Sequence, residues 1–132
     1  MAVDRTVNLT VPSRAPSLRL VCVCPSNVWV SILYIVAAGF HTRVDAIEAM
    51  KQVVAEVTPP SLDEEGCQIY HWSQGADDPT LFLLYMEWRD KACFEAHIAT
   101  PHVKHAEDRL KREKVLVGPA KEWHFYRLID GP

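Results

Sequence analysis

Two kinds of hydrophobic spacing alternate along the chain from residue 28 onward. The run Val28–Ala38 is rich in β-branched and aromatic residues, which favours a buried strand, and residues 39–43 form the turn after it. Apolar residues then recur every three or four positions from Val44 to Val57, which predicts one buried helix face. We expect Thr42 to cap this helix and Pro59-Pro60 to end it, because proline cannot continue the hydrogen-bond ladder.

The middle of the chain reads as two strands that follow an acidic loop at Ser61–Gly66. The predicted strands, Cys67–Ser73 and Leu81–Trp88, are separated by a cluster of turn-forming residues at 75–79. A short turn between two strands predicts an antiparallel hairpin. The second strand is apolar up to Glu87, a pattern typical of a strand that is covered on both faces.

The last third of the chain contains two helices and one more strand. Asp90 is the expected cap of a helix over Lys91–Ala99, and Thr100-Pro101 starts a second helix over His102–Lys114. The last strand is predicted over Lys121–Leu128. The order β-α-β-β-α-β, with the last helix interrupted, predicts an α+β ferredoxin-like fold.

Such a fold has a four-stranded antiparallel sheet with helices on one face only. Because the first and third predicted strands are apolar on both faces, we expect the bare face to meet a second copy of the chain. Two sheets that close face to face would form a homodimeric α/β barrel.

Composition and charge narrow the classes of protein. The length of 132 residues fits one domain, which we place at residues 28–132. Residues 1–27 are punctuated by proline and serine and are predicted to be a flexible extension, with a short strand or arm at Leu18–Cys24 as the alternative. The net charge of −3 disfavours binding to nucleic acid.

Membrane insertion and secretion are also disfavoured. The mainly apolar run Val28–Phe40 is shorter than the roughly 20 residues of a membrane-spanning helix. The four cysteines form no Cys-x-x-Cys pair and are too few for a small disulfide-rich scaffold. We therefore expect reduced thiols in a cytoplasmic protein.

Glu87 and His97 are the first candidates for chemistry. A carboxylate at the end of an apolar strand must face water, pair with a cation or have a raised pKa. Alternatives for Glu87 are exposure at the strand end or an ion pair with Arg89, Arg127 or a histidine. His97 shares an apolar helix face with Phe94, so it could exchange a proton with Glu87 or simply bond a backbone carbonyl in the core.

A metal site is not expected, although His97, His102 and His105 are residues of a type that binds metal ions. His102 and His105 are three residues apart on one helix, so only one of them should point inward. Aromatic residues are frequent on the predicted strands, which suits a cavity for a flat apolar ligand but also ordinary core packing.

The stretch from Glu64 to Leu110 contains a spaced set of residues: Gly66-Cys67, Tyr70, Asp78-Pro79, Phe82, Glu87-Trp88, His97 and His102. Through this set the stretch resembles the antibiotic biosynthesis monooxygenase family. The resemblance covers about Val28 to Leu128. It implies a dimeric α+β barrel with a small apolar cavity between the sheet and the helices of each subunit.

The resemblance also implies an activity and roles for these residues. Family members include monooxygenases that oxidise quinols or polyketide phenols with O2 and without a cofactor. On this basis Glu87 and His97 are the expected proton-transfer residues, and Tyr70, Phe82, Trp88 and His102 are expected to bind a small aromatic substrate. Haem is disfavoured, because the asparagine and histidine of the haem-degrading members fall near Val36 and Glu107.

Two alternatives remain open on the sequence. Thr100-Pro101-His102 and Glu64-Glu65-Gly66 also resemble an isomerase of a phosphorylated, sugar-like signal molecule that has the same fold. A non-enzymatic ligand-binding dimer would share the fold as well.

Overall fold

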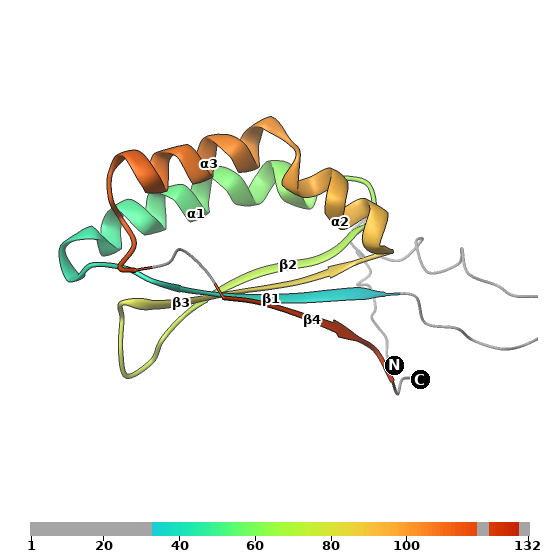
Figure 1. Cartoon of the computed structure of the whole chain (residues 1–132), viewed down its shortest axis with the longest axis horizontal. Helices are drawn as coiled ribbons and strands as arrows, with labels where there is room; N and C mark the ends of the chain where they lie inside the picture. The colour runs from blue at the N-terminus through green and yellow to red at the C-terminus, as the bar shows by residue number, and fades with distance from the viewer. Residues whose placement is uncertain (1–32, 119–121, 130–132) are drawn as a thin grey trace, which may run out of the picture. The chain divides into compact units, whose positions relative to one another are not determined.

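The computed structural model of the chain describes residues 33–118 and 122–129 (Figure 1). Its elements are β1 (Tyr34–His41), the 3-10 helix η3 (Val44–Ala46), α1 (Ile47–Leu62), β2 (Cys67–Gln74), β3 (Leu81–Trp88), α2 (Lys91–Ile98), α3 (Pro101–Arg112) and β4 (Glu122–Arg127). This is the predicted β-α-β-β-α-β order with an interrupted last helix. The predicted extension at residues 1–27, and hence the domain boundary at residue 28, lies outside the described residues.

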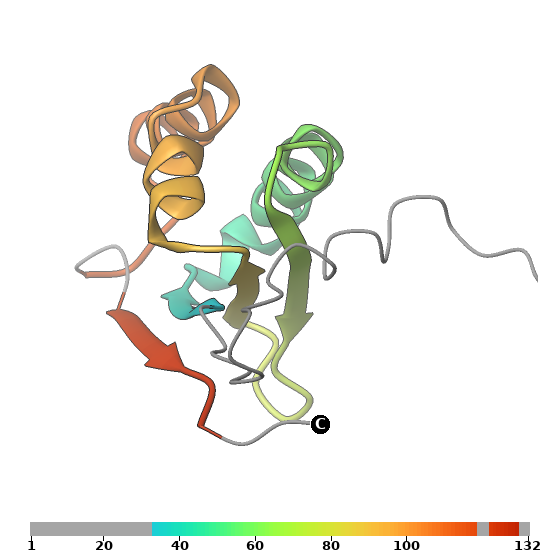
Figure 2. The same cartoon turned by 90° about the vertical axis from the view of Figure 1, so that its right-hand side faces the viewer.

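The four strands form one antiparallel sheet in the order β2-β3-β1-β4. The predicted hairpin of β2 and β3 is confirmed, and β3 has the predicted bounds. All the α-helices lie over one face of the sheet, as Figure 1 shows from the side and Figure 2 shows from the end. The ferredoxin-like α+β fold is therefore confirmed.

Side chains of β3 alternate between the two faces of the sheet. Phe82, Leu84, Met86 and Trp88 are buried beneath the helices. Leu83, between them, is 45% exposed. Within a single chain β3 is thus covered on one face, whereas its apolar sequence is typical of a strand covered on both.

Two predicted boundaries of α1 are wrong. Pro59 and Pro60 lie inside the helix, whose ladder closes again after them through the backbone N–H of Asp63 and the carbonyl of Pro59. The hydroxyls of Thr58 and Ser61 donate to carbonyls one turn earlier, which adds bonds in the turns that the prolines weaken.

Thr42 does not cap the helix. It is buried, and both its backbone N–H and its hydroxyl donate to the carbonyl of Thr80, so that it ties the end of β1 to the start of β3. The strand accordingly runs on to His41 through the predicted turn, and Arg43 is the N-terminal cap residue of η3, with no capping bond from its side chain. No helix of the described residues is long and apolar enough to cross a membrane.

Candidate functional site

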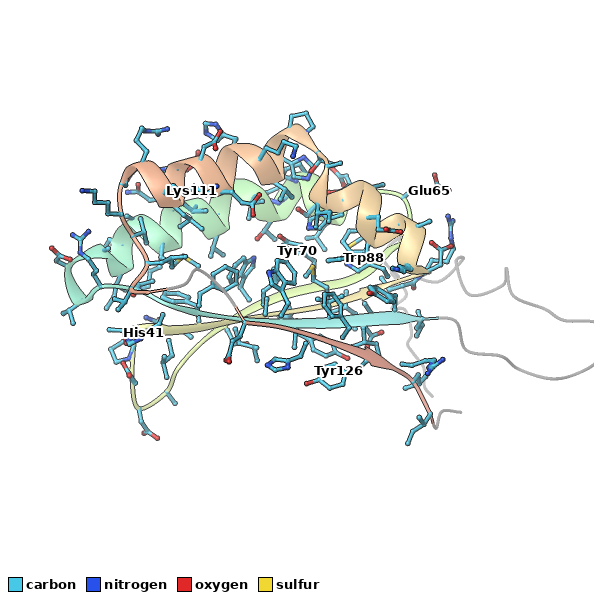
Figure 3. All side chains as sticks on the ribbon, viewed as in Figure 1. His41, Glu65, Tyr70, Trp88, Lys111 and Tyr126 are labelled. Atoms are coloured by element: carbon cyan, nitrogen blue, oxygen red, sulfur yellow. The ribbon has the colours of Figure 1, made fainter. Side chains whose placement is uncertain are left out.

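A cavity of about 510 Å³ lies between the sheet and the helices. Its wall is mostly aromatic and aliphatic, and its ring-bearing side chains are Phe40, Tyr70, Trp72, Phe94, His97, Trp123 and Phe125. Figure 3 shows Tyr70 in the layer between helices and sheet. A cavity of this size and composition suits a small, flat, apolar ligand.

His97 is a buried ionisable group of this wall, with 2% of its surface exposed. Its ring centroid lies 4.7 Å from that of Trp88 and 5.4 Å from that of Tyr70, which meets it edge-on. The helix that carries His97 starts at Asp90, whose carboxylate accepts a bond of 2.9 Å from the backbone N–H of Cys93. The cap and the two flanking rings together fix the position of the imidazole.

A half-buried carboxylate joins His97 to a second histidine. Oε2 of Glu64 lies 2.9 Å from Nδ1 of His97 and 2.6 Å from Nε2 of His102. The side chain of Glu64 is 15% exposed and that of His102 is 23% exposed. A buried carboxylate needs such donors, because desolvation without hydrogen bonds costs several kcal/mol.

This geometry assigns the tautomer of His97. A neutral imidazole has one N–H, and the carboxylate oxygen can only accept. A bond to Glu64 therefore requires the proton of His97 on Nδ1, which leaves the basic lone pair of the ring on Nε2. The arrangement is that of a histidine oriented by a carboxylate, as in acid–base catalysis.

The loop between α1 and β2 brings Glu64 to the helices. Gly66 has φ +85°, in the left-handed region, and its carbonyl accepts a bond of 2.7 Å from the backbone N–H of Arg89. A Cβ at this position would lie 2.4 Å from Sγ of Cys93 on α2. Glycine is thus required for the loop to approach α2 closely enough for Glu64 to reach His97.

Two groups on the elements around His97, the phenol of Tyr70 and the thiol of Cys93, have raised pKa values. Burial raises the pKa of Tyr70 to about 12, against a smaller opposite effect of the Ser61 hydroxyl. Tyr70 is therefore a phenol at physiological pH, able to donate a hydrogen bond but not to act as a base. Burial also raises the pKa of the Cys93 thiol, which disfavours it as a nucleophile.

The predicted proton-transfer pair of Glu87 and His97 does not form. Glu87 follows Met86 and precedes Trp88, which are both buried on the helix side, so its own side chain lies on the opposite face of β3. There it is half-buried and accepts a bond of 2.7 Å from the hydroxyl of Tyr85. The sheet separates the two groups.

The other predicted site residues lie in several places. Tyr70 lines the cavity with His97, and the fully buried Trp88 supports the imidazole without lining the cavity. His102 joins the site through Glu64 and lines a hollow between α1 and α3. Phe82 lines a separate hollow at the other end of β3, beside His41.

Glu64 is the site residue that was not predicted as such. It lies in a loop of three consecutive acidic residues, and nothing in the sequence separates this half-buried residue from its exposed neighbours Asp63 and Glu65. The signal in the sequence that could have indicated Glu64 is Gly66, because glycine is typical of positions where the backbone packs closely against another element. In the structure Gly66 has a positive φ.

The fold and the matched residues identify the family. The model of the antibiotic biosynthesis monooxygenase family matches residues 33–109, which include Glu64, His97 and His102. The chain belongs to this family. No match was found among curated proteins.

Solved structures show the same fold. A protein from Nitrosomonas europaea named "putative antibiotic biosynthesis monooxygenase" superposes with a TM-score of 0.70 at 24% identity, over 77% of this chain and 95% of its own. A protein of the same name from Deinococcus radiodurans superposes with a TM-score of 0.68 at 21% sequence identity, over 75% of this chain and 95% of its own. A conserved protein from Methanosarcina mazei superposes with a TM-score of 0.68 at 23% sequence identity, over 74% of this chain and 93% of its own.

The cap of α2 predicts a pH-dependent stability. The backbone N–H of Cys93 lowers the pKa of Asp90, so the cap stabilises the fold above pH about 4 and is lost as pH falls through the lowered pKa. Asp90→Ala should cost about 1 kcal/mol in urea unfolding at pH 7, and the difference from wild type should shrink in acid.

The matched control is Asp77→Ala, which removes an exposed aspartate from the turn between β2 and β3 and should change little. An Asp90→Ala protein as stable as wild type at pH 7, or a cost that persists unchanged below pH about 3, would contradict this role.

Proposed function

We propose that this family member is a monooxygenase that oxidises a small aromatic phenol or quinol with O2, without an organic cofactor or haem. The observation that supports the proposal best is a buried imidazole at the wall of an apolar cavity, with its Nδ1 bonded to a half-buried carboxylate. Such a site accepts a flat ring and offers one oriented base.

The proposed reaction begins when Nε2 of His97 removes the phenolic proton of the substrate, which leaves an anion whose charge is delocalised onto a ring carbon. The imidazolium that forms is stabilised by Glu64, 2.9 Å from Nδ1. The substrate carbanion then reduces O2 and forms a C–O bond, which gives a peroxide on the substrate carbon. His97 returns this proton to the peroxide. The hydrogen that remains on the same carbon then leaves as a proton to water while the O–O bond breaks and hydroxide departs, so that the CH2 group of an anthrone-type phenol becomes C=O and the second oxygen atom leaves as water.

Tyr70 and Trp88 have supporting roles in this proposal. Tyr70 lines the cavity as a neutral phenol and can donate a hydrogen bond to the substrate or the peroxide. Trp88 packs its indole ring against His97 and keeps the imidazole in place. Glu87 has no part in the proton transfer, because it lies on the other face of the sheet.

The alternative isomerase of a phosphorylated molecule is less well supported. Among the described residues, no lysine or arginine lines the cavity beside His97, and the carboxylate in its wall is that of Glu107. A phosphate group needs cations or backbone N–H donors. A purely ligand-binding module would use the same apolar cavity, so it is separated from the enzyme by measuring turnover.

Oxygen uptake with a panel of hydroquinones and anthrones tests the proposed activity. Wild type should consume O2, and His97→Gln should lower the rate by about 10²–10⁴-fold, because it removes the base. The matched control is His105→Gln, at an exposed position on α3, which should keep the wild-type rate.

The proposal fails if folded wild type consumes no O2 with any substrate of the panel. It also fails if His97→Gln, with a wild-type circular dichroism spectrum, retains the wild-type rate.

We further propose that a second copy of the chain covers the outer face of the sheet. Leu81 and Leu83 on this face are 43% and 45% exposed, and Tyr126 is 53% exposed. Figure 3 shows Tyr126 on the side of the sheet that faces away from the helices. Large apolar side chains gathered on one sheet face are typical of a protein–protein interface.

Light scattering during size-exclusion chromatography tests this assembly. Wild type should elute with twice the mass of one chain, and Leu83→Glu with the mass of one chain, because a buried unpaired carboxylate opposes association. Val44→Glu, at an exposed apolar position on η3, should remain a dimer. A wild-type protein that stays monomeric at high micromolar concentration would rule the dimer out.

A further inference from the structure

Glu64, His97 and His102 bring three ligand atoms of a kind that metals bind to within 4.8 Å of one another. They come from three segments: the loop after α1, helix α2 and the first turn of α3. We propose that this cluster binds a divalent first-row transition metal ion, such as Zn²⁺ or Co²⁺. This metal binding is a separate property from the oxygenation proposed above, which needs no metal ion.

The donor set decides the class of ion. Two imidazole nitrogens and one carboxylate oxygen suit Zn²⁺, Co²⁺, Ni²⁺ or Fe²⁺, whereas Ca²⁺ and Mg²⁺ prefer oxygen ligands. Three protein ligands leave at least one coordination position for water or another small ligand. We therefore expect an open site rather than a closed structural one.

The spacing of the ligand atoms is close to what an ion requires. Bonds of about 2.0–2.2 Å in tetrahedral geometry place ligand atoms about 3.3 Å apart. The carboxylate oxygen is 2.9 and 2.6 Å from the two nitrogens, at hydrogen-bond distance, and all three atoms lie within 4.8 Å. Binding would bring the two imidazole nitrogens, which lie within 4.8 Å of each other, to about 3.3 Å and move the Glu64 carboxylate away from them, so that metal bonds replace the two hydrogen bonds.

The surroundings hold the ligands in place before an ion arrives. His97 is packed between Trp88 and Tyr70, and the Gly66 turn fixes the loop that carries Glu64. The hydroxyl of Thr100 donates to the carbonyl of His97 at 2.7 Å, which ties the end of α2 to the start of α3 just before His102. Such preorganisation lowers the entropy that binding must overcome.

Metal binding has a consequence that rests on the proposed function. A metal on Nδ1 of His97 takes the place of the proton there, and a neutral imidazole must then carry its proton on Nε2. Nε2 is the atom that accepts the substrate proton in the proposed reaction. The bound ion would therefore inhibit the oxygenase activity, with no net change in the number of protons on the ring.

Titration of the metal-free, full-length protein with Co²⁺ and Zn²⁺ tests the site directly. Isothermal titration calorimetry should give one ion per cluster, and the Co²⁺ complex should show visible d–d absorption without a thiolate charge-transfer band. That band would report binding to cysteines such as Cys22 and Cys24 instead.

Matched variants locate the ion. Glu64→Gln and His102→Gln should each weaken metal binding by at least about tenfold. Even the mutation of residues that only hydrogen-bond to a metal ligand lowers metal affinity by about 10–100-fold. Glu65→Gln removes the adjacent exposed carboxylate, and His105→Gln removes an exposed histidine of the same helix. Both controls should bind as wild type does.

The site is disproved if folded wild type binds no ion outside its thiols, or if Glu64→Gln and His102→Gln bind as tightly as wild type. Oxygen uptake with one equivalent of Zn²⁺ is the separate test of inhibition. Undiminished activity of the ion-loaded enzyme would overturn the inhibition. Absence of activity in metal-free wild type would instead overturn the proposed function, and the binding titration still decides the metal site.

Discussion

The carboxylate of Glu64 is the constraint on which the site depends. It bonds one histidine from each of two helices through a single oxygen atom. That contact requires a glycine turn against α2, a capped start of α2 and the close succession of α2 and α3. Its result is a buried imidazole with a defined tautomer beside an apolar cavity, which is the basis of both proposed roles of the site.

The sequence predicted the fold better than the site, for a physical reason. Hydrophobic periodicity and caps predicted the order of elements, the hairpin of β2 and β3, and the start of α2 at Asp90. These signals are local. The position of Thr42 was decided by a bond to Thr80, 38 residues away, and no local pattern reports such a contact.

The wrong partner for His97 follows from the same limit. Side chains alternate along β3, so Glu87 lies on the other face of the sheet from the buried Trp88. Because the strand is apolar at nearly every position, its sequence does not indicate which face packs against the helices. Glu64 was indistinguishable from two acidic neighbours until the loop was folded. Family membership supplies the fold, whereas the chemistry depends on such individual side chains.

The tautomer of His97 is the most direct test of this account. Nitrogen-15 NMR of the histidine rings in metal-free protein, at pH above about 8 where imidazole is ordinarily neutral, can assign the ring proton, with His97→Gln identifying the signal. The account predicts the proton of His97 on Nδ1 and an unprotonated Nε2. A proton on Nε2, with Nδ1 unprotonated, would contradict the bond to Glu64 and the base chemistry that follows from it.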